Sequence, residues 1–544
     1  MGRVQSIVAR ANRKLTVQFA AALLAAATFA SMLFGILRIR FLNSYYYDTY
    51  PVGLDAFNAA FTLPDFMYFI LVSGALSVTF IPVFNQRLIH GNKKSAWQLS
   101  TSMVNLMALA TLIVSILMII FADPLIRYVI GPGFSEAGTA LAISMMRVIA
   151  VNPFLFAIAT VIASIQQAIG RFTFFALAPI VYNIGIIIGI LFFTNGINIF
   201  GWQVFEGGIM GVALGVVLGA VLQLIISSIG LIGLGFDYRF KIYWKNKGFR
   251  KVLRLLPPRS LDQGMDYVVS IVETNLASRM VAGTLSAYNY AVTLMMAPIN
   301  LIGVAISTAA FPKMADRWSE GRLDLFNSEL LTVLHVIVWL SLPIAAISFF
   351  TRGYLVNFIN PEGNKLMADL LGVLTLAILF RSVYYMAART FYAQQDTKTP
   401  LYISFFSIAL NIGLAVWFTT ALSMEAMGLA WAQAIVAGVE VAMLFVVMSM
   451  RLNGLFDQTF WHAVVKMIAA TGIMAVFSYI MVSLLPLEAG ANSSSHVPSP
   501  PFCFLVLVRG APYLSLSRFL HLKEADSIIM SVKKRLHRPK KAVE

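Results

Sequence analysis

Residues 207–234 read GGIMGVALGVVLGAVLQLIISSIGLIGL and include no charged side chain. A helix needs about 20 apolar residues to cross the hydrocarbon core of a bilayer, and this run is long enough. The segment that follows, 235–257, is basic and contains Arg239, Lys241, Lys245, Lys247, Arg250, Lys251 and Arg254. An uncharged run followed by a basic loop is typical of a transmembrane helix that ends in the cytoplasm.

Similar apolar runs recur along most of the chain. Of its 544 residues, 59% are hydrophobic and 12% are charged, whereas soluble domains carry about 25% charged residues. The sequence therefore predicts an all-α polytopic membrane protein with about fourteen transmembrane helices. The other predicted spans lie near 16–46, 55–84, 97–123, 139–165, 173–194, 260–282, 287–311, 326–350, 367–393, 401–420, 427–449, 460–485 and, interrupted by Arg509, 502–520.

The positions of the basic residues predict the orientation of the chain. The 40 Lys and Arg exceed the 24 Asp and Glu, which fits either nucleic-acid binding or the basic cytoplasmic loops of a membrane protein. Basic residues follow the even-numbered spans, as at Lys93, Lys313 and Lys398, whereas 195–206 has none. This alternation predicts that both termini are cytoplasmic, and that the chain contacts membrane lipids and no nucleic acid. The single cysteine, Cys503, excludes an intramolecular disulfide.

Two parts of the chain resemble each other. The motifs Gln166-Gln167 and Asn183-Ile184-Gly185 recur with the same spacing as Gln394-Gln395 and Asn411-Ile412-Gly413, and Ala75 to Pro82 resembles Ala305 to Pro312. We therefore predict two parallel six-helix lobes, as in transporters whose repeats are related by an axis along the membrane normal. The predicted organisation is an N-lobe at 16–234, a basic cytoplasmic linker at 235–257, a C-lobe at 258–450, C-terminal helices at 451–520 and a basic cytoplasmic tail at 521–544.

Polar residues inside the first two predicted spans are candidates for a functional site, because charge is costly in lipid. Arg38 and Arg40 lie within the first span. Either they face a wet cavity and hold an anion, since a guanidinium matches phosphate oxygens, or they reach from a shorter helix to the outer interface. Asp55 opens the second span as a site residue or as a helix N-cap, and Pro64 with Asp65 interrupts that span.

The seventh span supplies a second set of candidates. Glu273 is its deepest charge, Arg279 is a further cation for substrate, and Asn411 lies in the middle of a later span of the same predicted lobe. A carboxylate and an amide oxygen suit Na⁺, with a proton relay on Glu273 as the alternative. There is no Walker motif, so we expect a secondary transporter without a cofactor, coupled to Na⁺ or H⁺.

Several groups of residues, in order over roughly 16–485, form a more specific pattern. They are Gly35–Arg38, Asp55-Ala56-Phe57, Leu63-Pro64-Asp65, Gly74–Ser77 with Phe80–Val83, Gly131–Phe134 with Arg147, and Phe391–Pro400. Together they resemble the MurJ (MviN) family of bacterial lipid II flippases. The resemblance implies the fold of the multidrug/oligosaccharidyl-lipid/polysaccharide exporter superfamily, with a cationic cavity between two lobes and a groove for a polyprenyl tail.

The resemblance also implies a substrate. It implies export of a polyprenyl-pyrophosphate-linked peptidoglycan precursor across the bacterial cytoplasmic (inner) membrane, with Arg38 and Asp55 at positions essential in the family. The chain departs from the family at Met32, Tyr68 and Thr293, where arginines are usual, and 486–515 lacks family character. The missing cations weaken pyrophosphate binding unless other arginines, such as Arg40 or Arg279, replace them.

Three functional hypotheses follow. The first is a monomeric lipid II flippase that moves a lipid-linked oligosaccharide precursor by alternating access. The second is a drug or small-solute exporter of the same superfamily, which predicts an enclosed cavity with acidic and aromatic residues. The third is a non-transporting membrane scaffold, which predicts that Arg38 tolerates substitution.

The predicted topology is testable with reporter fusions. Fusions at Lys94, Lys247 and Lys398 are expected to give cytoplasmic signals, and fusions at Asn198 and Gly353 external ones, because basic loops stay inside. Paired cytoplasmic and periplasmic reporters at each position are the measurement. An external signal at Lys247 would overturn the assignment of spans.

Overall fold

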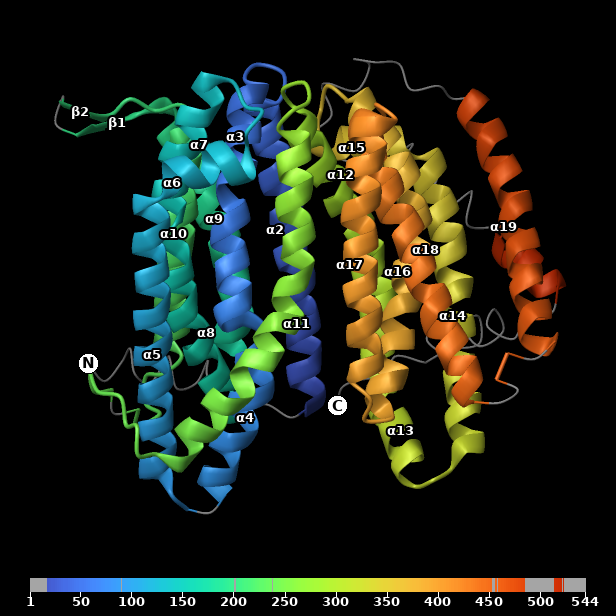
Figure 1. Ribbon diagram of the computed structural model, residues 1–544, viewed down its shortest axis with the longest axis horizontal. Coiled ribbons are helices and arrows are strands. Elements are labelled where there is room, and N and C mark those ends of the chain that lie inside the picture. Colours follow the sequence, from blue (N-terminus) through green and yellow to red (C-terminus); the bar gives the residue numbers. More distant parts are fainter. Residues whose placement is uncertain are drawn as a thin grey trace, which may run out of the picture. The chain divides into compact units, whose positions relative to one another are not determined.

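The computed structural model describes residues 17–484, apart from 90, 200–201, 237, 453–454 and 457, and also 513–520 and 522. The chain divides into two compact units, Met1–Ser286 and Ala287–Glu544. Helices dominate the described part of both units (Figure 1). Most of the basic tail expected at 521–544 and of the stretch 486–515 lies outside the described residues, as does Cys503.

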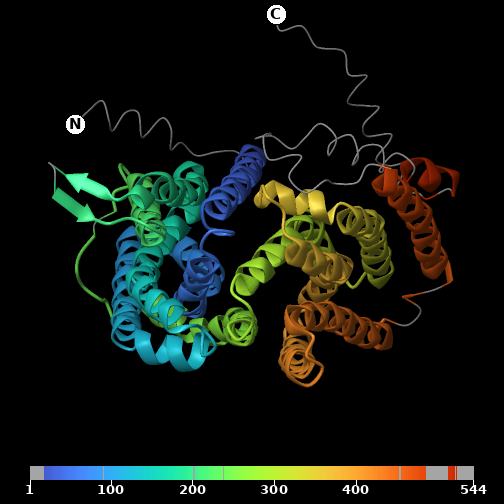
Figure 2. The ribbon, with the colours of Figure 1, turned by 90° about the horizontal axis from the view of Figure 1, so that it is seen from above.

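The first unit consists of helices and one short hairpin. Its elements are α2 (Val17–Tyr46), α3 (Pro51–Tyr68), η1 (Phe69–Ser73), α4 (Gly74–Ile89), α5 (Lys93–Ile120), α6 (Ala122–Pro124), η2 (Leu125–Ile130), α7 (Glu136–Ile149), α8 (Asn152–Ala168), α9 (Thr173–Phe192), η3 (Phe193–Asn195), β1 (Ile197–Ile199), β2 (Trp202–Phe205), α10 (Met210–Ile229) and α11 (Lys247–Ala277). The antiparallel hairpin β1–β2 projects from this unit (Figures 1 and 2).

The second unit is helical wherever it is described. After α12 (Thr284–Ile299), which begins at the unit boundary, come η4 (Asn300–Val304), α13 (Ala305–Ser319), α14 (Leu323–Phe350), α15 (Arg352–Ile359), α16 (Lys365–Ala393), α17 (Lys398–Val416), η5 (Trp417–Ala421), α18 (Glu425–Arg451) and α19 (Gln458–Leu484). Residues 513–519 form a further short helix. It is held to α14, because Trp339 Nε1 donates to Ser517 Oγ at 3.1 Å and the Tyr513 hydroxyl donates to the Trp339 carbonyl at 2.8 Å.

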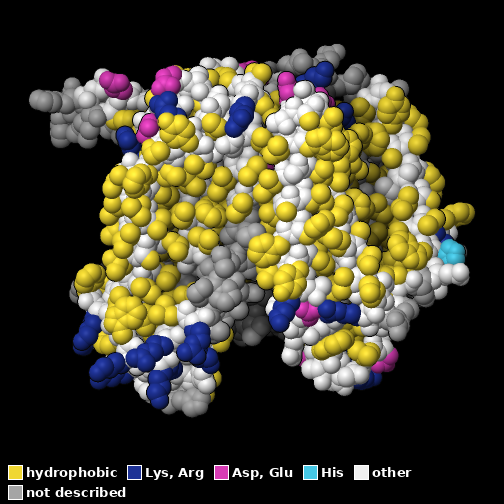
Figure 3. Space-filling model, viewed as in Figure 1, with side chains coloured by type: hydrophobic (Ala, Val, Ile, Leu, Met, Phe, Trp, Pro, Cys, Tyr) yellow, Lys and Arg dark blue, Asp and Glu magenta, His cyan; other side chains and the backbone are white. Residues whose placement is uncertain are grey.

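The predicted fold class is confirmed. Eleven helices of the described residues are long and apolar enough to cross a membrane, and each coincides with a predicted span. The predicted second span is also helical, as α3, η1 and α4, and the seventh is the polar helix α11. The total of about fourteen spans stays a prediction. On the face shown in Figure 3, apolar side chains cover the middle of each unit, and Lys and Arg gather towards the ends of its helices.

The boundary between the compact units differs from the predicted linker. The chain divides at Ser286 and not within 235–257, because α11 packs on α3, α4 and η1 of the first unit. The two predicted six-helix lobes therefore remain a prediction. The internal repeat has a structural counterpart, since a π-helical turn comes just before each of the two similar segments. The turn η1 ends at Ser73, two residues before Ala75, and η4 ends at Val304, next to Ala305.

Glycines bring α9 and α10 into close contact. A Cβ atom on Gly185 would lie 2.3 Å from the Cα of Gly219, and one on Gly215 would lie 2.5 Å from the Cα of Gly189. Small residues facing each other are the usual way in which membrane helices approach closely. The Asn183-Ile184-Gly185 motif thus contributes to this interface, whereas its counterpart Gly413 has no such neighbour within 4 Å.

This interface predicts opposite effects for two glycine substitutions. Gly215→Ala is expected to destabilise the protein by about 1–3 kcal/mol, because its methyl group meets backbone and α9 has to shift. Gly413→Ala, in open space on α17, is the matched control and is expected to leave stability unchanged or to raise it by up to about 1 kcal/mol. Thermal unfolding in detergent is the measurement, and equal melting temperatures for both variants would contradict the packing argument.

Candidate functional site

Arg38 belongs to a small polar cluster inside the first unit. Its side chain is half-buried on α2, which packs on α9. Its charge acts on two groups from other helices, the carboxylate of Asp65 on α3 and the hydroxyl of Tyr182 on α9. A guanidinium, a carboxyl group and a phenol from three helices therefore lie near one another in the first unit. Arg40 is also half-buried and has a partner of its own.

Aromatic side chains form one wall of this cluster. Tyr68 takes the position where the family usually has arginine, and its hydroxyl is 2.9 Å from Thr160 Oγ1 on α8. Phe156, also on α8, makes edge contacts with Tyr68 at 5.4 Å and with Tyr182 at 5.2 Å between ring centroids. A neutral hydroxyl pair and aromatic edges thus replace one expected cation.

The local sequence explains why α3 presents Asp65 and Tyr68 here. Pro64 is buried within α3, and without a backbone N–H it cannot bond the carbonyl four residues earlier. The helix then widens into the π turn η1 at Phe69–Ser73. Single π turns inside α-helices occur often at functional sites, because they redirect neighbouring side chains.

Asp55 caps a helix, but not its own. Its Oδ2 accepts a hydrogen bond from the Gly283 backbone N–H at 2.6 Å. Its Oδ1 accepts from the Ser286 backbone N–H at 2.8 Å and from the Ser286 hydroxyl at 2.6 Å. The carboxylate is buried at the start of α12, where the free N–H groups and the helix dipole favour an anion. Asn58 supports this contact, since its Nδ2 donates to Ser286 Oγ at 2.9 Å.

The Gly131–Phe134 motif positions the end of α11. A Cβ atom on Gly133 would lie 2.5 Å from the Cα of Arg279, so only glycine allows this approach. The Gly133 N–H also donates to Ser278 Oγ at 3.2 Å. Arg279 itself is exposed just beyond the end of α11, and its Nη2 donates to Asn275 Oδ1 in α11 at 3.1 Å. No contact between Arg279 and the Arg38 cluster is found among the described residues.

The two residues expected to bind Na⁺ lie in different compact units. Glu273 is buried on α11 in the first unit and has a partner. Asn411 is buried on α17 in the second, and its Oδ1 has no hydrogen-bond partner among the described residues. Within the described part of the chain, no group of three or more His, Cys, Asp or Glu could hold a metal ion.

Other charges in the second unit are satisfied structurally. Arg381 Nη1 on α16 lies 3.2 Å from Glu440 Oε2 on α18. Arg389 Nη1 donates to the Val304 carbonyl at 2.9 Å and thereby supports the π turn η4. Each interaction joins α16 to a neighbouring segment. A structural role therefore explains these two arginines without a substrate.

The Phe391–Pro400 motif forms the turn between α16 and α17. Burial alone raises the pKa of Asp396, but hydrogen bonds from Thr399, Arg451 and Lys398 outweigh it and lower the pKa to about 2. The carboxylate therefore stays ionised at neutral pH and caps the first turn of α17 through the Lys398 and Thr399 N–H groups. Arg451, at the end of α18, lies 2.6 Å from it. This motif has a structural role.

Sequence reasoning missed three members of the Arg38 cluster. Tyr182, Thr160 and Phe156 are neutral residues, and the search for intramembrane charge passed over them. The sequence contains one indication for Tyr182, which directly precedes the repeated Asn183-Ile184-Gly185 motif. It contains none for Thr160 and Phe156, since only the packing of α8 on α3 brings them to this place.

Comparisons with known proteins agree with this arrangement. A family model described as lipid II flippase MurJ matches residues 51–494. The probable lipid II flippase MurJ of Rhizobium meliloti (strain 1021) is 24% identical over 526 residues, covering 93% of this chain and 95% of that protein. The probable lipid II flippase MurJ of Rickettsia prowazekii (strain Madrid E) is 24% identical over 433 residues, covering 78% and 82%.

Solved structures show the same fold. A lipid II flippase MurJ in an inward closed conformation aligns with a TM-score of 0.74 and 22% identity, over 92% of this chain and 99% of that one. An inward-facing multidrug resistance MATE family transporter of the MOP superfamily aligns with a TM-score of 0.66 and 17% identity, over 79% and 96%. At these identities the likeness concerns the fold alone.

The fold is thus the α-helical fold that these two solved structures share, one of a lipid II flippase and one of a MOP superfamily transporter. The length of the family match decides to which family the chain belongs. The match spans most of the chain and includes Asp55, Asp65 and Asn411. The chain belongs to the lipid II flippase MurJ family. The family resemblance expected from the sequence is confirmed.

The Asp55 contact predicts a specific loss of stability. Asp55→Asn removes the charge and turns an amide NH₂ towards donors, so it is expected to cost about 1.5–3 kcal/mol, the range for hydrogen bonds to charged groups. Ser286→Ala, which keeps both backbone donors, is expected to cost less. Asp123→Asn is the matched control, because its pairing with Arg127 is exposed and such pairs contribute little. A melting temperature of Asp55→Asn equal to that of the control would contradict the assignment.

Proposed function

We propose that this chain moves a lipid-linked peptidoglycan precursor of the lipid II type across the bacterial cytoplasmic membrane by alternating access. Membership of the MurJ family supports the substrate class. The observation that carries the proposal is the cluster of Arg38, Asp65 and Tyr182 within a membrane-embedded unit. A transporter of an anionic substrate needs a cation that stays within a span and can exchange its partner, and in this proposal Arg38 has that role.

In this proposal Arg38 binds the pyrophosphate of the precursor. A guanidinium offers paired N–H donors that match two phosphate oxygens, which a point charge cannot do. Tyr182 and Tyr68 add neutral hydroxyl donors from α9 and α3, and Tyr68 stands where the family resemblance implies an arginine. Arg40 and Arg279 remain proposed substrate contacts, with Arg279 outside the cluster.

Asp55 and Pro64 have conformational roles in the proposed cycle. Asp55 fastens the start of α12 to α3 through three hydrogen bonds, so any movement of α12 away from α3 has to break them. Pro64 and η1 make α3 deformable at the level of Asp65. Each change of conformation would then break the hydrogen bonds of Asp55 and bend α3 near Pro64.

Ion coupling through Glu273 and Asn411 is part of the proposal. Among the residues that the structure describes, the buried Oδ1 of Asn411 has no hydrogen-bond partner. Such an oxygen is costly unless a donor or a cation meets it, and a hard oxygen suits Na⁺. The buried carboxylate of Glu273 supplies the negative charge. The same carboxylate would serve for H⁺ coupling instead.

The remaining features of the proposal concern the setting. We propose a secondary transporter and not an enzyme, active as a monomer in the inner membrane, with both ends cytoplasmic. The support for this orientation is the gathering of Lys and Arg after even-numbered spans, which is the sign of cytoplasmic loops. Membrane lipids and the lipid-linked precursor are the proposed partners.

Substitution of Arg38 tests the proposed function. Arg38→Ala is expected to weaken binding of a pyrophosphate lipid roughly ten- to a hundredfold, because charge-assisted bonds contribute about 1.5–3 kcal/mol. Arg38→Lys keeps the charge without the forked geometry and is expected to rescue only in part. The measurements are native mass spectrometry with the precursor lipid and complementation of a flippase-depleted strain.

The control for this test is Arg147→Ala, which removes an exposed arginine of α7. It is expected to bind and complement like the parent. Full activity of Arg38→Ala would contradict the anion site and favour a scaffold or an arginine that only reaches the interface. Parent protein that transports drugs and fails to bind the precursor would favour the small-solute exporter.

A further inference from the structure

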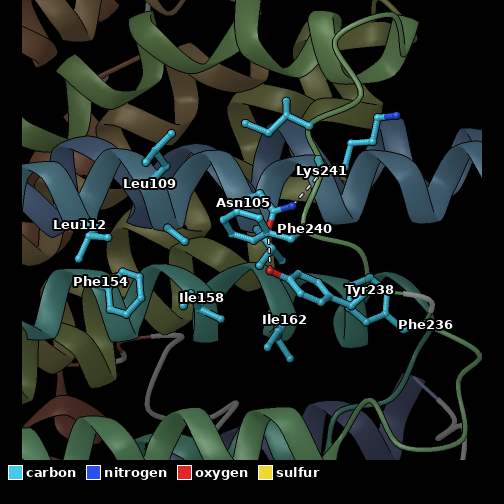
Figure 4. Close-up of a pocket in the computed structure, with 13 residues that line it drawn as sticks. Asn105, Leu109, Leu112, Phe154, Ile158, Ile162, Phe236, Tyr238, Phe240 and Lys241 are labelled. Atoms are coloured by element: carbon cyan, nitrogen blue, oxygen red, sulfur yellow. Dashed lines mark hydrogen bonds between the residues drawn. The ribbon is translucent and has the colours of Figure 1, made fainter.

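A cavity of about 500 Å³ lies between α5 and α8, away from the Arg38 cluster (Figure 4). Its volume is in the range of ligand pockets in proteins. Apolar side chains of the two helices form its walls, namely Val104, Leu109, Leu112, Phe154, Ile158 and Ile162. Leu109 and Leu112 are also among the exposed apolar residues of α5, so the cavity adjoins the apolar surface of the first unit.

The segment that follows α10 closes one end of the cavity. Asn105 Nδ2 donates to the carbonyl oxygens of Arg239 at 2.8 Å and Lys241 at 3.0 Å. The Tyr238 hydroxyl donates to Asn105 Oδ1 at 2.8 Å (Figure 4). The amide of Asn105 and the hydroxyl of Tyr238 are thus used by protein groups, and apart from Lys241 the other lining side chains are hydrocarbon. The interior therefore favours an apolar occupant.

The same segment has the composition of a membrane interface. Phe240 is 93% exposed, Trp244 is 56% exposed and Tyr238 is 50% exposed, and they alternate with Arg239, Lys241 and Lys245. Aromatic and basic residues gather where head groups meet hydrocarbon. An almost fully exposed phenylalanine next to a basic residue fits this layer better than it fits water. The cavity therefore runs from the head-group level into the hydrocarbon.

The position of the cavity separates it from the proposed transport site. Phe154, Ile158 and Ile162, spaced four residues apart, lie on one face of α8 and line the cavity. Phe156 and Thr160 contact the Arg38 cluster, and residues two apart on a helix point in nearly opposite directions. One helix thus serves two separate sites.

We propose that this cavity holds an acyl chain of an anionic phospholipid, whose phosphate lies at Lys241 and Arg239. Charge complementarity selects this occupant, because the anionic lipids of the cytoplasmic leaflet attract basic segments next to the membrane. The apolar walls take the chain, and the basic residues at the covered end take the head group. The bound lipid ties the segment after α10 to the bilayer.

Photolabelling of the full-length protein tests this lipid site. The protein is reconstituted in phosphatidylcholine nanodiscs with a small fraction of phosphatidylglycerol that carries a diazirine in one acyl chain. Labels are mapped by mass spectrometry and are expected on the parts of α5 and α8 that line the cavity. Ala108→Trp, which fills the cavity, is expected to lower this labelling at least tenfold.

A charge variant keeps the test informative if Ala108→Trp fails to fold. Lys241→Gln, at an exposed position, is expected to lower labelling about fivefold, the effect of one basic residue near an anionic lipid. Lys247→Gln is the matched control, an exposed lysine of the same basic region that does not line the cavity, and it is expected to label like the parent. Arg38→Ala is also expected to label like the parent, because its cluster lies on the other side of α8.

Three results would overturn the proposal. If the labels in the parent protein were spread evenly over all exposed helices, the lipid would be ordinary boundary lipid and not a lipid bound in the cavity. Equal labelling of Lys241→Gln and Lys247→Gln would remove the head-group site. An unlabelled cavity in the parent would mean that another occupant, such as a protein segment, fills it.

Discussion

A bilayer offers no water to polar groups, so each one has to find its partner within the protein. Several polar residues of the described chain follow this rule. Gln166 is fully buried and donates to the Ser227 carbonyl at 2.7 Å. The contact exists because Gly230 leaves room, since a Cβ atom there would lie 2.2 Å from Gln166 Oε1. Asn105, Arg381 and Arg389 are likewise bonded to groups of neighbouring segments. These four polar residues therefore hold neighbouring segments together.

The segment around Pro64 departs from this regular hydrogen bonding. Pro64 removes a backbone bond from α3, and the π turn η1 begins where α3 ends, at Phe69. Asp65 and Arg38, which interact here, are both half-buried by exposed surface. The Arg381–Glu440 pair differs in its carboxylate, because Glu440 is buried and only Arg381 is half-buried. Removing the partner of a buried charge is costly, so the Arg381–Glu440 pair is the harder of the two to separate.

The sequence predicted the elements well and their partners poorly. Long apolar runs identify spans because the length of a helix in lipid is set by bilayer thickness, and all eleven apolar helices coincide with predicted spans. The grouping of α11 with the first unit was not predicted, because an apolar or basic composition says nothing about which helix is a neighbour. Asp55 was found as a candidate, but its partner Ser286 lies far along the chain. Thr160 and Phe156 owe their roles to packing alone.

The exchange of an arginine for Tyr68 bears on how the proposed site handles charge. Tyr68 and Thr160 form a neutral pair, so among the described residues of this cluster Asp65 is the one acidic side chain near Arg38. In the proposed cycle, a substrate anion that binds Arg38 would compete with this carboxyl group. A pyrophosphate carries more charge than one carboxylate and can accept both N–H groups of the guanidinium fork, so it would displace Asp65 where a weaker anion would not. Asp65 lies next to Pro64 in α3, and the π turn η1 follows α3. Substrate binding would thereby act on the segment that bends in the proposed cycle, and Tyr68 would strengthen this coupling because it adds no positive charge near Asp65.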